Sequence, residues 1–175
     1  MRNAATKLLI RPARDADCAA ASELCWRSKA VWGYDEAFMN RCRDSLAVTP
    51  ERLERETVLV AEGQSGRLLG VVSVSAADAA VPAETTGATD SEPPEPPSAE
   101  LELLFVAPEA MRAGLGATLL DHGCRAARDR GARVLWILSD PGAESFYRRR
   151  GAVRVGMRPS DAIPGRELPW LRLAL

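Results

Sequence analysis

The stretch from residue 105 to 120, FVAPEAMRAGLGATLL, most strongly limits what this chain can fold into. It reads as the end of a strand, a turn with two glycines and the start of a helix. Gly114 and Gly116 carry no Cβ, so a ligand can approach the backbone closely there. The first N–H groups of a helix lack intrahelical partners, and the helix dipole favours an anion beside them. The stretch therefore predicts a cradle for a phosphate or pyrophosphate, and so a nucleotide-type cofactor.

Length and composition exclude several classes of protein. The 175 residues fit one domain, 1–175, that is large enough to bury a core. A net charge of −1 provides no basic field, so we expect no nucleic-acid partner. No apolar run approaches the length of a membrane span or of a signal peptide core, which favours a cytoplasmic protein without a membrane partner. Four cysteines without a CxxC pair and one histidine, His122, predict reduced thiols and no metal site.

Hydrophobic periodicity predicts strands and helices in a mixed order. We expect strands at 7–11, 57–62, 68–75, 100–106, 134–138, 152–157 and 170–175. We expect helices at about 15–31, 35–46, 116–130 and 143–150, with a short turn or helix after residue 49. This order favours an α/β fold with a mixed sheet of about six to seven strands and about four helices.

Residues 76–99 differ in composition from the rest of the chain. They contain five prolines and several acids but no bases, so we expect a mobile acidic loop rather than a packed element. Two interpretations remain open. The loop is either a solvated insertion or an acidic lid that steers a cationic substrate.

The glycine turn matches neither of two common nucleotide-binding patterns. A dinucleotide fingerprint needs a third glycine where Leu119 stands, and a P-loop needs GK followed by Ser or Thr. VAPEAMRAGLG instead resembles the acetyl-CoA signature of the GNAT acetyltransferase superfamily, V-x-P-x-x-(Q/R)-x-x-G-x-G/A. Residues 139–152, SDPGAESFYRRRGA, are similar to its second signature, N-x-x-A-x-x-F-Y-x-x-x-G. The layout of strands and helices agrees over nearly the whole chain, so the resemblance implies a GNAT fold with a mostly antiparallel sheet.

The resemblance also implies an activity. Such a protein uses acetyl-CoA as co-substrate and moves the acetyl group to a primary amine of a small molecule or peptide by direct attack in a ternary complex. A homodimer is compatible with the resemblance. Two positions depart from the signatures, because Met111 stands where Gln or Arg is usual and Asp140 where Asn is usual. These departures keep open an alternative, a non-catalytic acyl-CoA-binding or sensing protein.

The resemblance assigns a set of cofactor-binding residues. The backbone of Phe105 and Val106 would pair with the pantetheine arm as an added strand does. Asp140 and Tyr147 would contribute from the second signature. The pyrophosphate would be surrounded by Arg112, Ala113, Gly114, Leu115, Gly116 and Ala117, with Thr118 adding a hydroxyl. The arginines at 148–150 either form a solvated helix end or reach the phosphates.

Acetyl transfer needs a base for the amine, a donor for the oxyanion and an acid for the leaving thiolate. Tyr147 stands where the superfamily often places the acid, and a phenol with a pKa near ~10 holds its proton at neutral pH. The alternative is that Tyr147 only packs against the cofactor. By resemblance, a backbone N–H near Val106 is the oxyanion donor.

Glu102 is the candidate base, with Glu100 as substitute on the same face. Burial of a carboxylate on an otherwise apolar strand costs free energy, so such a residue usually has a partner or a catalytic role. The alternatives are that Glu102 faces a solvent groove or pairs with an arginine. Period-two alternation predicts that Glu102 shares one face with Leu104 and Val106. The other face would carry Leu101, Leu103 and Phe105.

Two further segments, 28–34 (SKAVWGY) and 160–170 (SDAIPGRELPW), are similar to those of a bacterial branch of the superfamily with mostly unassigned substrates. In this fold, the first helices and the last hairpin flank the acceptor groove. Our acceptor-site candidates are therefore Trp32, Tyr34, Arg166 and Trp170. Aromatic side chains there would hold an apolar or cationic acceptor. The alternative is that both tryptophans fill the core or a dimer interface.

Overall fold

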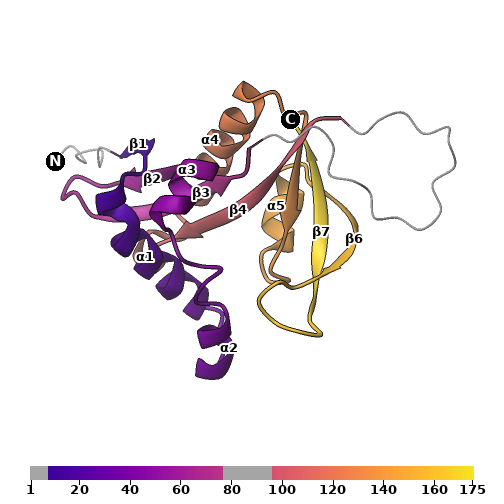
Figure 1. The fold of residues 1–175 in the computed structure, drawn as a ribbon, viewed down its shortest axis with the longest axis horizontal. Helices are drawn as coiled ribbons and strands as arrows, with labels where there is room; N and C mark the ends of the chain where they lie inside the picture. The colour runs from indigo at the N-terminus through magenta and orange to yellow at the C-terminus, as the bar shows by residue number, and fades with distance from the viewer. Residues whose placement is uncertain (1–7, 77–95) are drawn as a thin grey trace, which may run out of the picture.

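Seven strands form one sheet in the computed structural model, which describes residues 8–76 and 96–175 (Figure 1). The sheet order is β1-β2-β3-β4-β5-β7-β6. Only β4 and β5 pair in parallel, and each other pair of neighbours is antiparallel. This confirms the predicted mixed, mostly antiparallel sheet. The strands are β1 (Leu9–Pro12), β2 (Thr57–Glu62), β3 (Leu68–Val74), β4 (Ser98–Val106), β5 (Val134–Leu138), β6 (Val153–Pro159) and β7 (Glu167–Ala174).

The helices agree with the predicted positions, with local differences at their ends. Asp35 caps α2 by accepting the backbone N–H of Phe38 at 2.8 Å, as its position predicts. The α-helix at this point ends at Arg41 rather than near residue 46. Asp17 precedes α1, but its carboxylate binds the Arg11 guanidinium instead of capping the helix. The helices are α1 (Cys18–Ala30), α2 (Glu36–Arg41), α3 (Pro50–Arg55), α4 (Leu115–Asp129) and α5 (Glu144–Arg149).

The helices cover both faces of the sheet and bury a separate apolar cluster on each (Figure 1). On one face, α4 and α5 pack on β3, β4, β5 and β7 through residues such as Leu119, Leu120 and Leu171. Gly123 lets α4 lie close to the sheet, because a Cβ there would be 2.9 Å from Val72. On the other face, α1 and α2 pack through residues such as Leu24. No described helix combines the length and apolar character needed to cross a bilayer.

The centre of the sheet splits where β4 and β5 part. The two strands pair only from Ser98–Val134 to Leu101–Ile137, although β4 continues to Val106. Beyond Leu101, β4 therefore keeps its antiparallel partner β3 on one edge and has a free edge facing the end of β5. A gap in the sheet follows, and it positions the candidate site.

Two expectations about β4 are wrong. The strand begins at Ser98, so residues 98 and 99 belong to it rather than to the expected loop; residues 77–95 of that loop lie outside the described residues. The pairing with β3 also skips a residue, because Val74 lies opposite Leu101 and Ser73 opposite Leu103. This irregularity at Glu102 breaks the alternation, as a β-bulge does. Leu101 therefore packs in the α4-side core and Leu103 in the α1-side core, not on one face.

Candidate active site

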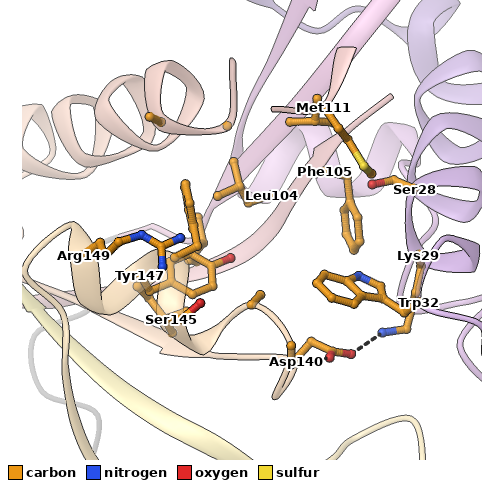
Figure 2. Close-up of a pocket in the computed structure, with 18 of the residues that line it drawn as sticks. Ser28, Lys29, Trp32, Leu104, Phe105, Met111, Asp140, Ser145, Tyr147 and Arg149 are labelled. Atoms are coloured by element: carbon orange, nitrogen blue, oxygen red, sulfur yellow. Dashed lines mark hydrogen bonds and ion pairs between the residues drawn. The ribbon is translucent and has the colours of Figure 1, made fainter. Parts of the chain in front are cut away.

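A cavity of about 580 Å³ opens where β4 and β5 part (Figure 2). Its walls come from the end of α1, the free part of β4, the turn before α4, the end of β5 and α5. We refer to it as the gap cavity. The structure brings together in it ten of the predicted site residues, namely Trp32, Glu102, Phe105, Val106, Arg112, Gly114, Gly116, Ala117, Asp140 and Tyr147. It does not bring there Tyr34, Ala113, Leu115, Thr118, Arg166 or Trp170.

The free edge of β4 presents backbone groups to this cavity. Ala107 donates its N–H to the Leu69 carbonyl of β3 at 2.8 Å. Successive residues of a strand point their backbone groups to opposite edges, so the N–H and C=O of Val106 face the gap. Leu104 faces it as well, whereas Phe105 faces β3. Of the two residues predicted to pair with an extended ligand, Val106 therefore offers its backbone, and Leu104 takes the place expected for Phe105.

The turn before α4 has the conformation of an anion-binding concavity. Arg112 and Gly114 both adopt left-handed backbone angles, with φ of 63° and 83°. Such alternating conformations bring successive N–H groups to one side, at the positive end of a helix. Leu115 is buried in the core and anchors the first turn. The Thr118 hydroxyl donates to the Gly114 carbonyl at 3.3 Å, so Leu115 and Thr118 direct their side chains away from the cavity.

One of the three arginines at the end of α5 lines the gap cavity. Arg148 lies 3.9 Å from Glu144, and Arg150 lies 2.9 Å from Asp121. Arg149 forms no ion pair with the described residues and lines the cavity opposite the α1 side (Figure 2). It supplies, with Arg112, a positive charge that an anionic ligand could neutralise.

Tyr147 projects from α5 into the wall of the gap cavity (Figure 2). Its side chain is buried and packs edge-on against Phe146, with ring centroids 5.1 Å apart. Burial, together with the negative charge of Asp140, raises the pKa of the phenol above its usual range. The hydroxyl makes no hydrogen bond to the described residues. A protonated phenol with a free donor therefore lies at the cavity.

Glu102 lines the gap cavity and a second cavity described below. Burial, followed by the charges of Glu56 and Glu100, raises the pKa of its carboxyl to about 7. Arg52 opposes this shift but is held by Glu56 in an ion pair of 2.8 Å. Among the described residues, Glu102 itself makes no ion pair. Glu100 has a weaker claim as base, because it faces Arg158 at 3.7 Å.

A second cavity of about 540 Å³ adjoins the first, and we refer to it as the hairpin cavity. It lies between β4 and the β6–β7 hairpin and contains the predicted residues Arg166 and Trp170. Trp170 stacks on Trp136 with ring centroids 5.1 Å apart, so it forms part of a rigid aromatic wall. Both cavities are lined by Lys29, Leu101, Glu102, Phe105, Leu138 and Leu168.

Trp32 and Tyr34 do not lie in the hairpin cavity where we expected the acceptor residues. Trp32 lines the gap cavity and covers Gly142, at which a Cβ would lie 2.5 Å from the indole. Tyr34 lines neither cavity and stacks on Phe38 with ring centroids 4.0 Å apart. Its hydroxyl belongs instead to a polar cluster at the boundary between the cavities.

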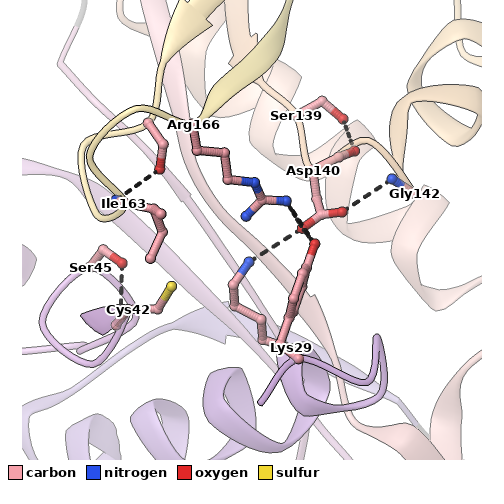
Figure 3. A network of polar contacts seen from close by, with 10 residues as sticks. Lys29, Cys42, Ser45, Ser139, Asp140, Gly142, Ile163 and Arg166 are labelled. Carbon is pink, nitrogen blue, oxygen red and sulfur yellow. Dashed lines mark hydrogen bonds and ion pairs between the residues drawn. The ribbon is translucent and has the colours of Figure 1, made fainter. Parts of the chain in front are cut away.

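Asp140 is the centre of this cluster (Figure 3). Its Oδ2 accepts from the Tyr34 hydroxyl at 2.7 Å and lies 3.4 Å from Lys29 Nζ and 3.6 Å from Arg166 Nη2. Arg166 also donates to the Tyr34 hydroxyl at 2.8 Å. Burial opposes ionisation of Asp140, but the Tyr34 hydrogen bond, the Gly142 N–H and both cations outweigh it, so the pKa is lowered. We call these four residues the Asp140 cluster.

Sequence reasoning missed Lys29 and the Arg52–Glu56 pair. Lys29 lies in a segment that the sequence singles out, but one lysine on a helix carries no signal of its own. The spacing of Arg52 and Glu56 predicts an ion pair on a helix, yet not its place beside Glu102. Ser73 on β3 donates to the same Glu56 carboxylate. These residues matter because long-range packing brings them to the site.

His122 and Cys124 both lie on α4 and line neither cavity. The four cysteines are unbonded, and three of them are buried. Within residues 8–76 and 96–175, no three His, Cys, Asp or Glu side chains converge as metal ligands do.

Residues 20–152 match the model of the Acetyltransferase (GNAT) family. No curated protein sequence is significantly similar to the chain. Among solved structures, the chain is similar to a GCN5-related N-acetyltransferase from Rhodopseudomonas palustris, with a TM-score of 0.71, 21% identity, and coverage of 99% of this chain and 100% of that one.

Two further similar structures contain ligands. The PaiA N-acetyltransferase from Thermoplasma acidophilum, in complex with coenzyme A, gives a TM-score of 0.66 at 15% identity and covers 97% of this chain and 99% of that one. A GNAT family acetyltransferase from Brucella melitensis, in complex with acetyl-CoA, gives a TM-score of 0.56 at 22% identity. The match covers 97% of this chain and 88% of that one. At these identities, the structures establish a shared fold.

Proposed function

The chain belongs to the acetyltransferase (GNAT) family, and from this premise we propose that it transfers the acetyl group of acetyl-CoA to a primary amine. One observation carries the proposal: the free edge of β4 leads directly into the left-handed turn at the start of α4, within one cavity. An extended arm that ends in a pyrophosphate needs these two features in this order. Acetyl-CoA has that shape.

The residues present fit acetyl-CoA as co-substrate. The backbone of Leu104 and Val106 would pair with the pantetheine amides as an added strand does. The N–H groups around Gly114 and Gly116 would hold the pyrophosphate, with charge from Arg112 and Arg149. Met111 lines the same cavity without supplying a charge. Met111 has the same backbone groups as the Gln or Arg usual at this position, so the substitution changes a side chain and leaves the N–H donors of the turn in place.

Three groups of the chain would act on the transferred acetyl group. Glu102, as a carboxylate, takes the proton of the ammonium so that the amine nitrogen can attack the thioester carbon. The N–H of Leu104, the gap-facing donor near Val106, donates to the oxyanion as the C–N bond forms, while the Leu104 C=O and the Val106 backbone pair with the pantetheine arm. Tyr147 then gives its proton to the departing sulfur as the C–S bond breaks, and its phenolate takes up the second proton that the nitrogen must lose to become an amide. The products are an amide and a thiol, and no bond to the protein forms.

The test is calorimetric titration of the purified chain with acetyl-CoA, free CoA and NADH, followed by thiol release with a panel of amines. We expect saturable binding of acetyl-CoA and CoA, no binding of NADH, and thiol release that depends on the amine. Binding without release for every amine would favour the acyl-CoA-binding or sensing alternative. Failure to bind either CoA compound would overturn the assignment of the gap cavity.

A further inference from the structure

The hairpin cavity has ends of opposite charge. Lys29 and Arg166 line it at the Asp140 cluster, where two cations share one carboxylate. Glu102 and Asp161 line it elsewhere and form no ion pair with the described residues. The cavity is therefore dipolar, with excess positive charge at the cluster and excess negative charge near β4, where the charge of the lining residue Arg52 is neutralised by its ion pair with Glu56.

Donors remain free at the positive end. Arg166 uses Nη2 for both Tyr34 and Asp140, and in the described part of the chain no hydrogen bond involves its Nε or Nη1. Among the described residues, Lys29 Nζ has one hydrogen-bond acceptor, Asp140 at a long 3.4 Å, and it also lies over the Tyr34 ring at 5.2 Å from the centroid. Both side chains are mostly shielded from solvent. A cation with free N–H groups at a cavity wall is satisfied best by an anion, above all a carboxylate that can accept two hydrogen bonds.

The negative end suits an ammonium group. Asp161 lies near enough to Glu102 for its charge to contribute to the raised pKa of the Glu102 carboxyl. Glu100 adds a third carboxylate, partly offset by Arg158 at 3.7 Å. Glu102 also borders the gap cavity, so an ammonium held beside it would lie where the acetyl group arrives.

We propose that the acceptor is an amino acid: its carboxylate binds Lys29 and Arg166, and its amine binds at Glu102. This rests on the proposed function and names the substrate class of that site. An amine that carries no carboxylate would leave the N–H donors of Arg166 without an acceptor, in a position shielded from water. A diamine would place its second ammonium against two cations. Leu168 and the Trp170 wall favour an apolar side chain on the amino acid.

The experiment compares matched trios in the thiol-release assay at saturating acetyl-CoA. Each trio is an amino acid, its amide and the amine left after decarboxylation: leucine, leucinamide and isopentylamine, with the same sets for methionine and phenylalanine. We expect kcat/KM for the acid to exceed that for either partner by at least tenfold in the best trio. The difference should lie chiefly in KM, because the carboxylate contributes to binding but takes no part in the making or breaking of bonds.

Variants locate the source of the preference. Arg166→Gln should reduce the ratio of acid to amide at least tenfold while acetyl-CoA affinity changes little. Lys29→Met is the second variant, for use if Arg166→Gln does not fold. Arg158→Gln is the matched control, because Arg158 lines the same cavity but faces Glu100 and covers the Trp170 ring at 4.3 Å. It should leave the ratio unchanged.

Amides, decarboxylated amines or diamines used as well as the acids would overturn the proposal while leaving acetyl transfer intact. An equal loss for all three members of a trio in Arg166→Gln would also overturn it, since it would assign Arg166 a purely structural role. Thiol release with none of the amines, despite acetyl-CoA binding, would instead contradict the proposed function, and the acceptor class with it.

Discussion

The gap cavity and the hairpin cavity adjoin, but different parts of the chain build them. In the gap cavity, the features that suit a ligand are mainly backbone: the free edge of β4 and the left-handed turn at Arg112 and Gly114. In the hairpin cavity, they are side chains from separate segments, held by the Asp140 cluster. Recognition by backbone groups tolerates substitutions of side chains. Recognition by side chains, as in the hairpin cavity, changes with a single substitution. Under the proposed function, the co-substrate is therefore held by features that tolerate substitutions and the acceptor by features that substitutions alter.

The largest expected effect comes from a substitution that blocks the backbone turn of the gap cavity. Gly114→Trp should abolish acetyl-CoA binding in calorimetry, because no atom lies within 4 Å of a Cβ there and the indole would occupy the cavity. The matched control is Gly131→Trp, at the other end of α4, where φ is 95° and a Cβ also meets nothing. Both variants carry the same left-handed strain of about 1–2 kcal/mol. Equal loss of binding in the two would mean that strain, not the cradle, is responsible.

The next prediction compares substitutions of the two tyrosines of the chain, one at the gap cavity and one in the Asp140 cluster. Tyr147→Phe should lower kcat by roughly 10²–10⁴-fold, as expected for loss of a general acid, with acetyl-CoA affinity nearly unchanged. Tyr34→Phe removes a hydroxyl from the Asp140 cluster instead, so it should raise the KM of the acceptor more than it lowers kcat. Steady-state kinetics with both substrates measure the difference. Unchanged kcat in Tyr147→Phe would remove its role as acid.

The smallest effect concerns Glu102, at the boundary between the cavities. The base must be a carboxylate, and its pKa is about 7, so kcat/KM should rise with pH up to about 7 and then level off. Glu102→Gln should lower kcat/KM about 10²-fold at pH 8 and abolish this rise. A rise at the same pH in the variant would assign the titration to another group.

Glu56→Gln provides the companion measurement. The charge of Glu56 raises the pKa of Glu102, so its removal should move the rise in kcat/KM to lower pH. Loss of the Glu56 charge also frees Arg52, which acts in the same direction. A movement to higher pH would contradict this account of the Glu102 carboxyl.

The same comparison shows what could be predicted from the sequence. The turn at Gly114 is local, because strand, turn and helix follow one another within sixteen residues, and its conformation depends on residue types that the sequence displays. The mixed sheet and most helices follow from periodicity in the same way. The first strand ends at Pro12, one residue beyond the expected range 7–11, because a missing N–H is tolerated at the end of an edge strand.

The rest depends on contacts between distant residues. The bulge at Glu102 results from pairing with β3, so period-two alternation could not place Leu101 and Leu103 on different faces. Asp140 and Arg166 meet only because the end of β5 and the β6–β7 hairpin lie side by side. No spacing in the sequence encodes such a meeting. The roles of Tyr147 and Glu102 stay predictions.

The short pairing of β4 with β5 has a consequence for the stability of the molecule. Within the sheet, four residue pairs join the half formed by β1–β4 to the half formed by β5–β7, and outside the sheet the apolar core under α4 and the Asp140 cluster connect the halves. A ligand bound between the halves would contact both of them. At a free concentration of about a hundred times its Kd, it would raise the free energy of unfolding by about 2.7 kcal/mol. Under the proposed function, we therefore expect the lifetime of the protein against unfolding and proteolysis to follow the supply of acetyl-CoA, with the seam between β4 and β5 as the first place to open when that supply falls.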